Sequence, residues 1–128
     1  MGAEFSLVLD AQCALGESPV WWAAGQRLVF VDITGRRLHR FDPRTGVHEV
    51  DVVEEDIGCV APAKGGGYVA GFRSGVWLLD AAGAKVRELA ANPENTADHR
   101  FNDGRVDPRG RYLSGTLDDS KSKGDGGL

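Results

Sequence analysis

The sequence lacks any long apolar run, since no stretch approaches the roughly 20 apolar residues that a membrane-spanning helix needs. Its first 18 residues contain neither a basic segment nor a sustained apolar one, so they do not resemble a secretion signal. Basic residues form no cluster longer than the pair Arg36 and Arg37, and the net charge is -4. Nucleic-acid binding requires a strong positive patch. We therefore expect no membrane and no nucleic-acid partner, which leaves a small uncharged or weakly anionic ligand.

Cysteine is also scarce, with only Cys13 and Cys59 in 128 residues. A disulfide framework in a short secreted chain usually needs a denser set of cysteines. Free cysteines in proteins are commonly buried. We therefore expect two buried thiols in a cytoplasmic protein.

Several motifs that carry chemistry are missing. The sequence contains no GxxxxGK[ST], GxSxG, HExxH or CxxC motif. The glycines at positions 65–67 form a turn between strands with no helix after it to bind a phosphate. The acidic tail at 118–124 has lysines where a calcium loop has ligands, and we interpret it as a solvated loop. Nucleotide chemistry is therefore disfavoured.

Glycine is the abundant residue, with 18 of 128 positions, about twice the average usage. These glycines fall between short β-rich runs, often where a turn favours a positive φ, and no helical stripe exceeds two turns. The pattern predicts an all-β chain whose strands cover 18–22, 27–32, 37–42, 47–53, 59–62, 67–72, 75–80, 85–90, 104–106 and 112–116.

An internal repeat decides among the all-β architectures. Residues 19–46 and 61–83 share one order of strands and turns, and a third copy opens at Val106. The period is about 42–45 residues, the length of one four-stranded propeller blade. A closed propeller needs about four to eight blades. We therefore expect residues 1–128 to be the N-terminal part of a single β-propeller domain, about two and a half blades long, with a complete small β-sandwich as the alternative.

Two polar segments lie where a propeller has its open central face. The first holds Glu17 in LGESPVW, and residue statistics alone favour an exposed loop acid there. The second is RFNDG, in which Asn102, Asp103 and Gly104 have the composition of a tight hairpin turn. The histidines add little: His39 and His48 alternate within strands and are expected to be exposed, and His99 is expected in a loop.

The runs LGESPVWW, RLVFVDITGRRLHRFDPRTG and HRFNDGRVDPRGRYLSGTLDD resemble the senescence marker protein/gluconolactonase (regucalcin-like) family from about Leu15 to Asp119. The resemblance implies a six-bladed propeller that holds one divalent cation and hydrolyses sugar lactones. It implies that Glu17 is a metal ligand. It also implies that Arg100 and Asn102 bind the sugar, with Asp103 and Gly104 in the turn that directs them.

Other parts of the family's site have no counterpart in this sequence. The resemblance places an Asn ligand and an Asp that is both ligand and general base in later blades. One pocket carboxylate of some members falls near Ser120, where this sequence departs from the pattern. The catalytic base is therefore expected beyond residue 128.

These expectations favour a metal-dependent lactonase whose substrate is a small sugar lactone. A cation held by oxygen ligands leaves positions open for substrate and water, while Arg and Asn side chains suit a polyhydroxylated ring. A non-catalytic propeller platform for a sugar or protein, and a related propeller hydrolase of another ester or of an organophosphate, remain alternatives because fold does not fix activity. The 128-residue chain alone should be inactive and should self-associate through its open blade edge.

Overall fold

The computed structural model describes residues 2–120 and 126–127. Within them, each of the ten predicted strands is present. Nine have ends shifted by one or two residues at most, and the ninth begins at His99 instead of Gly104. The strands are β1 (Gly16–Trp22), β2 (Arg27–Asp32), β3 (Arg37–Phe41), β4 (His48–Val52), β5 (Ile57–Pro62), β6 (Tyr68–Phe72), β7 (Gly75–Leu79), β8 (Lys85–Ala91), β9 (His99–Val106) and β10 (Tyr112–Asp118). The described residues form no helix that could cross a membrane.

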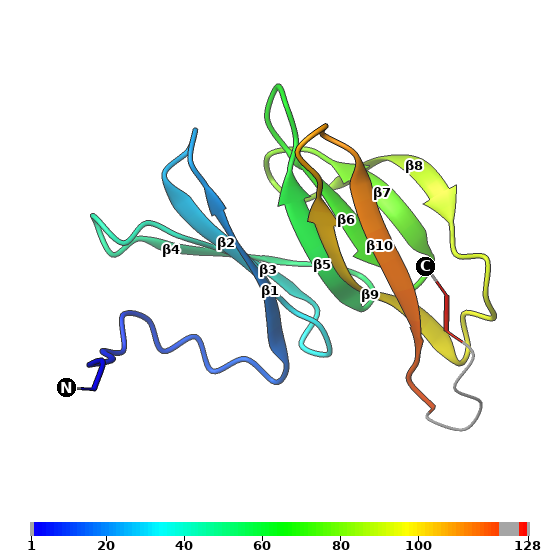
Figure 1. Ribbon diagram of the computed structural model, residues 1–128, viewed down its shortest axis with the longest axis horizontal. Helices are drawn as coiled ribbons and strands as arrows, with labels where there is room; N and C mark the ends of the chain where they lie inside the picture. Colours follow the sequence, from blue (N-terminus) through cyan, green and yellow to red (C-terminus); the bar gives the residue numbers. More distant parts are fainter. Residues whose placement is uncertain (1, 121–125, 128) are drawn as a thin grey trace.

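The strands form two four-stranded antiparallel sheets and one strand pair (Figure 1). Each sheet follows chain order, β1 to β4 and β5 to β8, and β9 pairs with β10. The repeat is visible in the second strand of each unit, which begins at Arg27, Tyr68 and Tyr112. This is the predicted arrangement of two propeller blades and the first two strands of a third.

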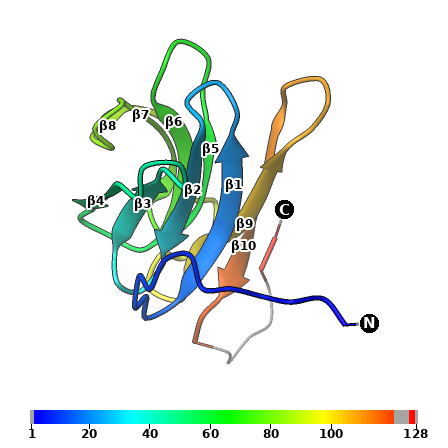
Figure 2. The ribbon, with the colours of Figure 1, turned by 90° about the vertical axis from the view of Figure 1, so that its left-hand side faces the viewer.

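The first strands of the three units lie next to one another. β1 contacts β5, and β5 contacts β9; the views from two sides show β1, β5 and β9 running in the same direction (Figures 1 and 2). The backbone N–H of Val60 on β5 donates to the Ser18 Oγ on β1 over 3.2 Å. On the other side, a Cβ at Gly58 would lie 2.1 Å from the carbonyl oxygen of Phe101 on β9. Glycine at this position therefore allows blade two to approach the third unit closely.

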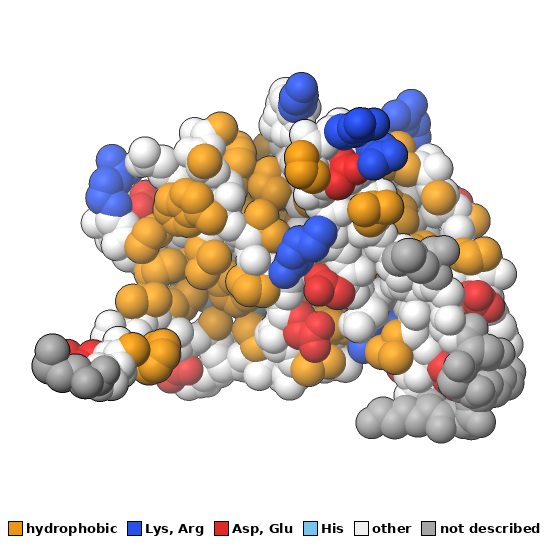
Figure 3. All heavy atoms as spheres, viewed as in Figure 1, with side chains coloured by type: hydrophobic (Ala, Val, Ile, Leu, Met, Phe, Trp, Pro, Cys, Tyr) orange, Lys and Arg blue, Asp and Glu red, His pale blue; other side chains and the backbone are white. Residues whose placement is uncertain are grey.

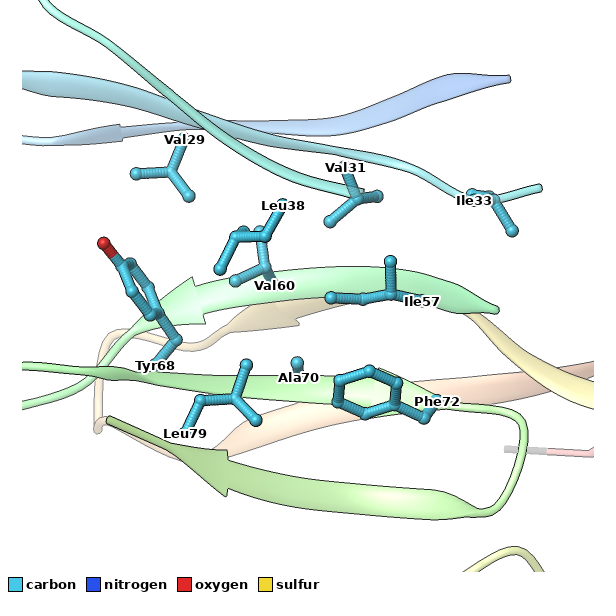
Figure 4. Close-up of a cluster of buried hydrophobic side chains, with 10 residues drawn as sticks. All are labelled: Val29, Val31, Ile33, Leu38, Ile57, Val60, Tyr68, Ala70, Phe72 and Leu79. Carbon is cyan, nitrogen blue, oxygen red and sulfur yellow. The ribbon is translucent and has the colours of Figure 1, made fainter. Parts of the chain in front are cut away.

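The main core lies between the two complete blades. Val29, Val31 and Leu38 of the first blade point toward Ile57 and Val60 of the second (Figure 4). Tyr68, Ala70, Phe72 and Leu79 complete the cluster on the side of the second blade, and Ile33 closes it on the side of the first. Since β-branched and aromatic side chains pack well on pleated strands, the alternating strand pattern directs one face of each blade into this core.

Other blade faces remain open. Apolar side chains gather over the first blade in the space-filling view (Figure 3), and the exposed large apolar side chains of the molecule include Trp21, Val50, Val52, Leu113 and Leu117. Monomeric proteins rarely expose broad apolar patches. Apolar surface is exposed on the first blade and on β10.

Two glycine turns differ from the expectation. Gly46, Gly83 and Gly110 adopt positive φ, as expected, but in the turns at Gly25 and Gly35 the positive φ falls on Gln26 and Arg36 instead. At Gly35 the requirement is space, because a Cβ there would lie 2.1 Å from the Asp32 carboxylate.

The predicted hairpin at Asn102, Asp103 and Gly104 is wrong. All three residues lie inside β9, whose pairing with β10 runs from His99 to Val106. The turn falls later, where Asp107 Oδ1 accepts hydrogen bonds from the N–H groups of Arg109 and Arg111 and Gly110 takes a φ of 80°. His99, expected in a loop, begins β9 and is buried. The expected solvated loop at 118–124 lies outside the described residues from position 121 onward.

Candidate functional site

Glu17 is fixed by an irregularity in β1. It pairs with Val31, after which the register shifts before pairing resumes at Val20. Ser18, within the shift, has a φ of 56° and is buried, and its hydroxyl accepts the hydrogen bond from Val60 described above. A bulge of this kind redirects a side chain at the start of a strand. The half-buried Glu17 side chain lines a pocket of about 290 Å³, together with Gly16, Pro19, Leu28 and Phe30, and with the N-terminal segment.

Arg100 and Asn102 meet on β9. The Arg100 Nη1 donates to the Asn102 Oδ1 over 3.1 Å and to the carbonyl oxygen of Phe101 over 3.2 Å. Arg100 is only 6% exposed, and its Nε lies 3.8 Å from the Asp119 carboxylate. The two predicted substrate residues therefore form one unit, with a carboxylate behind the guanidinium.

A half-buried ion network positions the start of β9. Arg73, in the turn after β6, pairs with Asp119 and lies 2.7 Å from Asp56. The same guanidinium donates to the carbonyl oxygen of His99 over 3.2 Å. Burial opposes the charged form of Asp56, but its hydrogen bonds with Arg73 and Arg36 hold the pKa of this carboxyl below the usual value. The network therefore joins the first residue of β9 to the second blade.

The strand segments that carry Glu17 and the pair on β9 both lie next to β5. Ser18 contacts β5 at Val60, and the Asn102 carbonyl would lie 2.8 Å from a Cβ at Gly58, two positions earlier on the same strand. Within residues 2–120, Glu17 makes no hydrogen bond or ion pair with Arg100 or Asn102. The structure therefore brings the strands of the three predicted residues together, but only Arg100 and Asn102 into contact.

Sequence reasoning missed a second polar cluster on the first blade. Cys13, Asp32 and His39 each contribute one potential ligand atom, and these three atoms lie within 4.8 Å of one another. His39 is 3% exposed, so the expectation of an exposed histidine is wrong, and His48 is half-buried. Strand alternation correctly places His39 and Leu38 on opposite faces of β3. The segment before β1, which brings Cys13 next to His39, has no strand periodicity. The only hint of this cluster in the sequence is that Cys13 and His39 are residue types that often bind metals.

The electrostatics of this cluster follow from burial and hydrogen bonding. Burial opposes ionisation of Asp32, yet the backbone N–H groups of Leu15, Ala14 and Gly35 hold its pKa below the usual value. Burial, followed by the proximity of His48, lowers the pKa of His39. The site therefore combines a carboxylate with a neutral imidazole near pH 7.

The two cysteines differ in their surroundings. Both are free thiols, but only Cys59 is buried, and Cys13 is half-exposed, which corrects the expectation of two buried thiols. The Cys59 Sγ lies 2.7 Å from the Tyr112 hydroxyl and 3.4 Å from the Ser114 hydroxyl. Burial raises the pKa of Cys59 and that of Tyr112. Cys59 is therefore a protonated, structural thiol.

Comparison with known proteins identifies the family. A family model described as the SMP-30/gluconolactonase/LRE-like region matches residues 15–128. The chain belongs to this family. The SMP-30/gluconolactonase match begins next to Glu17 and includes Arg100 and Asn102.

Curated relatives carry lactonase and regucalcin names. A Pseudomonas putida protein named 6-deoxy-6-sulfogluconolactonase is 41% identical over 128 residues, which cover all of this chain and 44% of the relative. Regucalcin of Xenopus laevis is 45% identical over 110 residues, 86% of this chain and 37% of the relative. The chain thus spans less than half the length of these relatives.

Solved structures agree on the fold. A calcium-binding protein, regucalcin from Agrobacterium tumefaciens, superimposes with a TM-score of 0.81 at 24% identity, over 89% of this chain and 39% of the other. A luciferin-regenerating enzyme gives a TM-score of 0.72 at 26% identity, over 83% and 37% of the two chains. The SMP-30/gluconolactonase chain is therefore part of a β-propeller.

Proposed function

We propose that this chain is the N-terminal part of a sugar-lactone hydrolase and that residues 1–128 belong to a single propeller domain. The observation that carries the proposal is the family match over residues 15–128. The relative named 6-deoxy-6-sulfogluconolactonase supports a lactone of a sugar acid as the substrate class. The free thiols Cys13 and Cys59 are compatible with a cytoplasmic location.

Arg100 and Asn102 would bind the hydroxyl groups of the sugar. Because the Asn102 Oδ1 accepts from Arg100, the amide nitrogen of Asn102 is directed away and can donate to a substrate oxygen. Asp119 near the Arg100 Nε keeps the guanidinium in place. This pair therefore supplies oriented donors whose geometry is set before the substrate arrives, which reduces the cost of binding.

Glu17 would supply one ligand to a divalent cation. A carboxylate at the rim of a pocket is a suitable oxygen donor for a hard cation. Among the described residues, the one cluster of three or more metal-ligating side chains is Cys13, Asp32 and His39, which does not include Glu17. A cation at Glu17 therefore needs oxygen ligands from the rest of the protein, so the residues present fit such an ion only in part.

The reaction requires attack of water on the lactone carbonyl. A bound divalent cation supplies Lewis-acid polarisation of that carbonyl. The role of this chain is to orient the ring, because Asn102 and Arg100 would bind its hydroxyl groups. The bulge at Ser18 would fix the Glu17 carboxylate in position to bind the cation. The general base would come from beyond residue 128.

A proton-release assay tests this function. Gluconolactone and pentonolactones are supplied to the full-length protein and to the 128-residue chain, each with and without a chelator. We expect turnover by the full-length protein that the chelator abolishes, and none by the short chain. Sugar binding without turnover would instead support a binding platform, and hydrolysis restricted to other esters or organophosphates would support a related hydrolase. Comparable metal-dependent turnover by the short chain would show that assigning the site to both parts of the propeller is wrong.

A further inference from the structure

The cluster on the first blade has the dimensions of a metal site. The Cys13 Sγ and His39 Nε2 lie 3.8 Å apart, and an oxygen of Asp32 completes a group whose three atoms all lie within 4.8 Å of one another. In a tetrahedral zinc site, with Zn–S about 2.3 Å and Zn–N about 2.0–2.1 Å, sulfur and nitrogen are about 3.5 Å apart. A small contraction would therefore place one ion between the three side chains.

His39 is already oriented as a ligand. Its Nδ1 lies 2.8 Å from the Nε2 of His48, so that with the proton on Nδ1 the Nε2 lone pair faces Cys13. The ring also stacks on Phe30 with centroids 4.6 Å apart and planes inclined by 13°. Metal-bound histidines usually donate their second ring N–H to a hydrogen-bond acceptor, which fixes the ring. His48 would have this role.

Asp32 is held by three backbone N–H groups and retains a lone pair for a ligand. Its Oδ1 accepts from Leu15 and Gly35, whereas its Oδ2 accepts only from Ala14. These bonds also fix the segment that carries Cys13 above His39. Asp32 and His39 are 4% and 3% exposed, and Cys13 is half-exposed. Solvent therefore has access from the thiol side, where water can complete the coordination.

We propose that Cys13, Asp32 and His39 bind a zinc ion, in addition to the divalent cation proposed at Glu17. A thiolate, an imidazole and a carboxylate suit zinc, whereas calcium and magnesium prefer oxygen ligands. The thiolate and carboxylate charges balance the charge of the ion. The site joins the N-terminal segment to β2 and β3, so zinc should stabilise the first blade.

Cobalt(II) provides a direct test, because it occupies zinc sites and absorbs in the near ultraviolet when bound to sulfur. The reduced, metal-free, full-length protein is titrated with Co²⁺ and then with Zn²⁺ or Ca²⁺. We expect a sulfur-to-cobalt band that saturates at one equivalent and that Zn²⁺, but not Ca²⁺ at the same concentration, removes. Binding of Co²⁺ through oxygen ligands alone gives no such band, which separates this site from one at Glu17.

Matched variants identify the ligands. Cys13→Ser should abolish the band, and His39→Asn should weaken Zn²⁺ binding at least tenfold, whereas Cys59→Ser should retain both. His48→Gln should keep the band but weaken affinity about 10- to 100-fold. Circular dichroism confirms that each variant is folded. A missing band in the unaltered protein, a band that survives in Cys13→Ser, or equal loss in Cys59→Ser would each overturn the proposal.

Discussion

Arg100 donates a hydrogen bond to the side chain of Asn102, two positions further along the same strand. Side chains two apart on a strand lie on one face of the sheet. Because the guanidinium is buried and held near Asp119, it orients an amide that is only half-buried. The pair is thus one unit in which a buried guanidinium fixes the position of a half-buried amide.

This relationship predicts the effect of removing the amide. In the full-length protein, Asn102→Ala should lower kcat/KM for a sugar lactone by about 3- to 10-fold, the amount expected for one neutral hydrogen bond. Arg105→Ala is the matched control, because Arg105 lies on the same strand but is exposed and, among the described residues, forms its ion pair with the neighbouring Asp103. Initial rates over a range of lactone concentrations give both constants. An equal decrease in the control would contradict a specific role for Asn102.

A second prediction concerns Glu17. Glu17→Gln removes one negative oxygen ligand without changing the side-chain volume, so the full-length protein should bind its catalytic cation at least tenfold more weakly and recover activity at higher metal concentration. Glu88→Gln, on the exposed outer strand β8, should leave the metal dependence unchanged. Activity is measured against free metal concentration in a metal buffer. Identical curves for Glu17→Gln and the unaltered protein would exclude Glu17 as a ligand.

The third prediction concerns the half-buried carboxylate of Glu55. Its oxygens accept from the Ser74 N–H at 2.6 Å, the Ser74 hydroxyl at 2.8 Å and the Lys85 ammonium at 2.5 Å. Burial opposes ionisation, but the hydrogen bonds from Lys85 and Ser74 dominate and lower the pKa of Glu55. The stabilisation is therefore fully present above the unfolded-state pKa near 4.5 and is lost as the pH falls through the lower folded-state value.

Urea unfolding at several pH values checks this prediction. Glu55→Gln should lower the free energy of unfolding by about 1.5–3 kcal/mol at pH 7, and the difference should shrink below pH 4.5. The neighbouring Glu54, whose side chain is 75% exposed, also pairs with Lys85. Glu54→Gln should therefore cost less than about 1 kcal/mol. A difference for Glu55→Gln that persists unchanged in acid would refute the electrostatic explanation.

A fourth prediction concerns the open third unit. Within the described residues, β10 pairs only with β9 as a strand, and Leu113 and Leu117 on it are 52% and 37% exposed. We expect the 128-residue chain to self-associate through such apolar surface. The double substitution of Leu113→Lys and Leu117→Lys should weaken association by about tenfold or more, since tenfold corresponds to only about 1.4 kcal/mol.

Sedimentation velocity over a range of protein concentrations measures this association. Val86→Lys is the control, because Val86 is 61% exposed on the outer strand of a complete blade. It should leave the concentration dependence unchanged. A short chain that stays monomeric at high micromolar concentration would contradict the prediction.

The sequence by itself determined the strands and their grouping into blades. Alternating apolar residues and the turn chemistry around Asp42, Asp80 and Asp107 are local signals, so the period could be counted without knowledge of any long-range contact. The family resemblance added Glu17, Arg100 and Asn102 as candidate residues. The structure places the last two on β9, a strand whose start was predicted too late.

Only the tertiary structure decided which side chains are covered and which meet. Asn102, Asp103 and Gly104 favour a turn locally, but pairing with β10 and packing of Phe101 against Gly58 and Gly71 hold them in a strand. His39 is polar and was expected at the surface, yet the irregular N-terminal segment, anchored on Asp32, covers it. The physical reason is the same in both cases: contacts between residues distant in the chain outweigh local propensities of less than about 1 kcal/mol, and such contacts leave no periodic trace in the sequence.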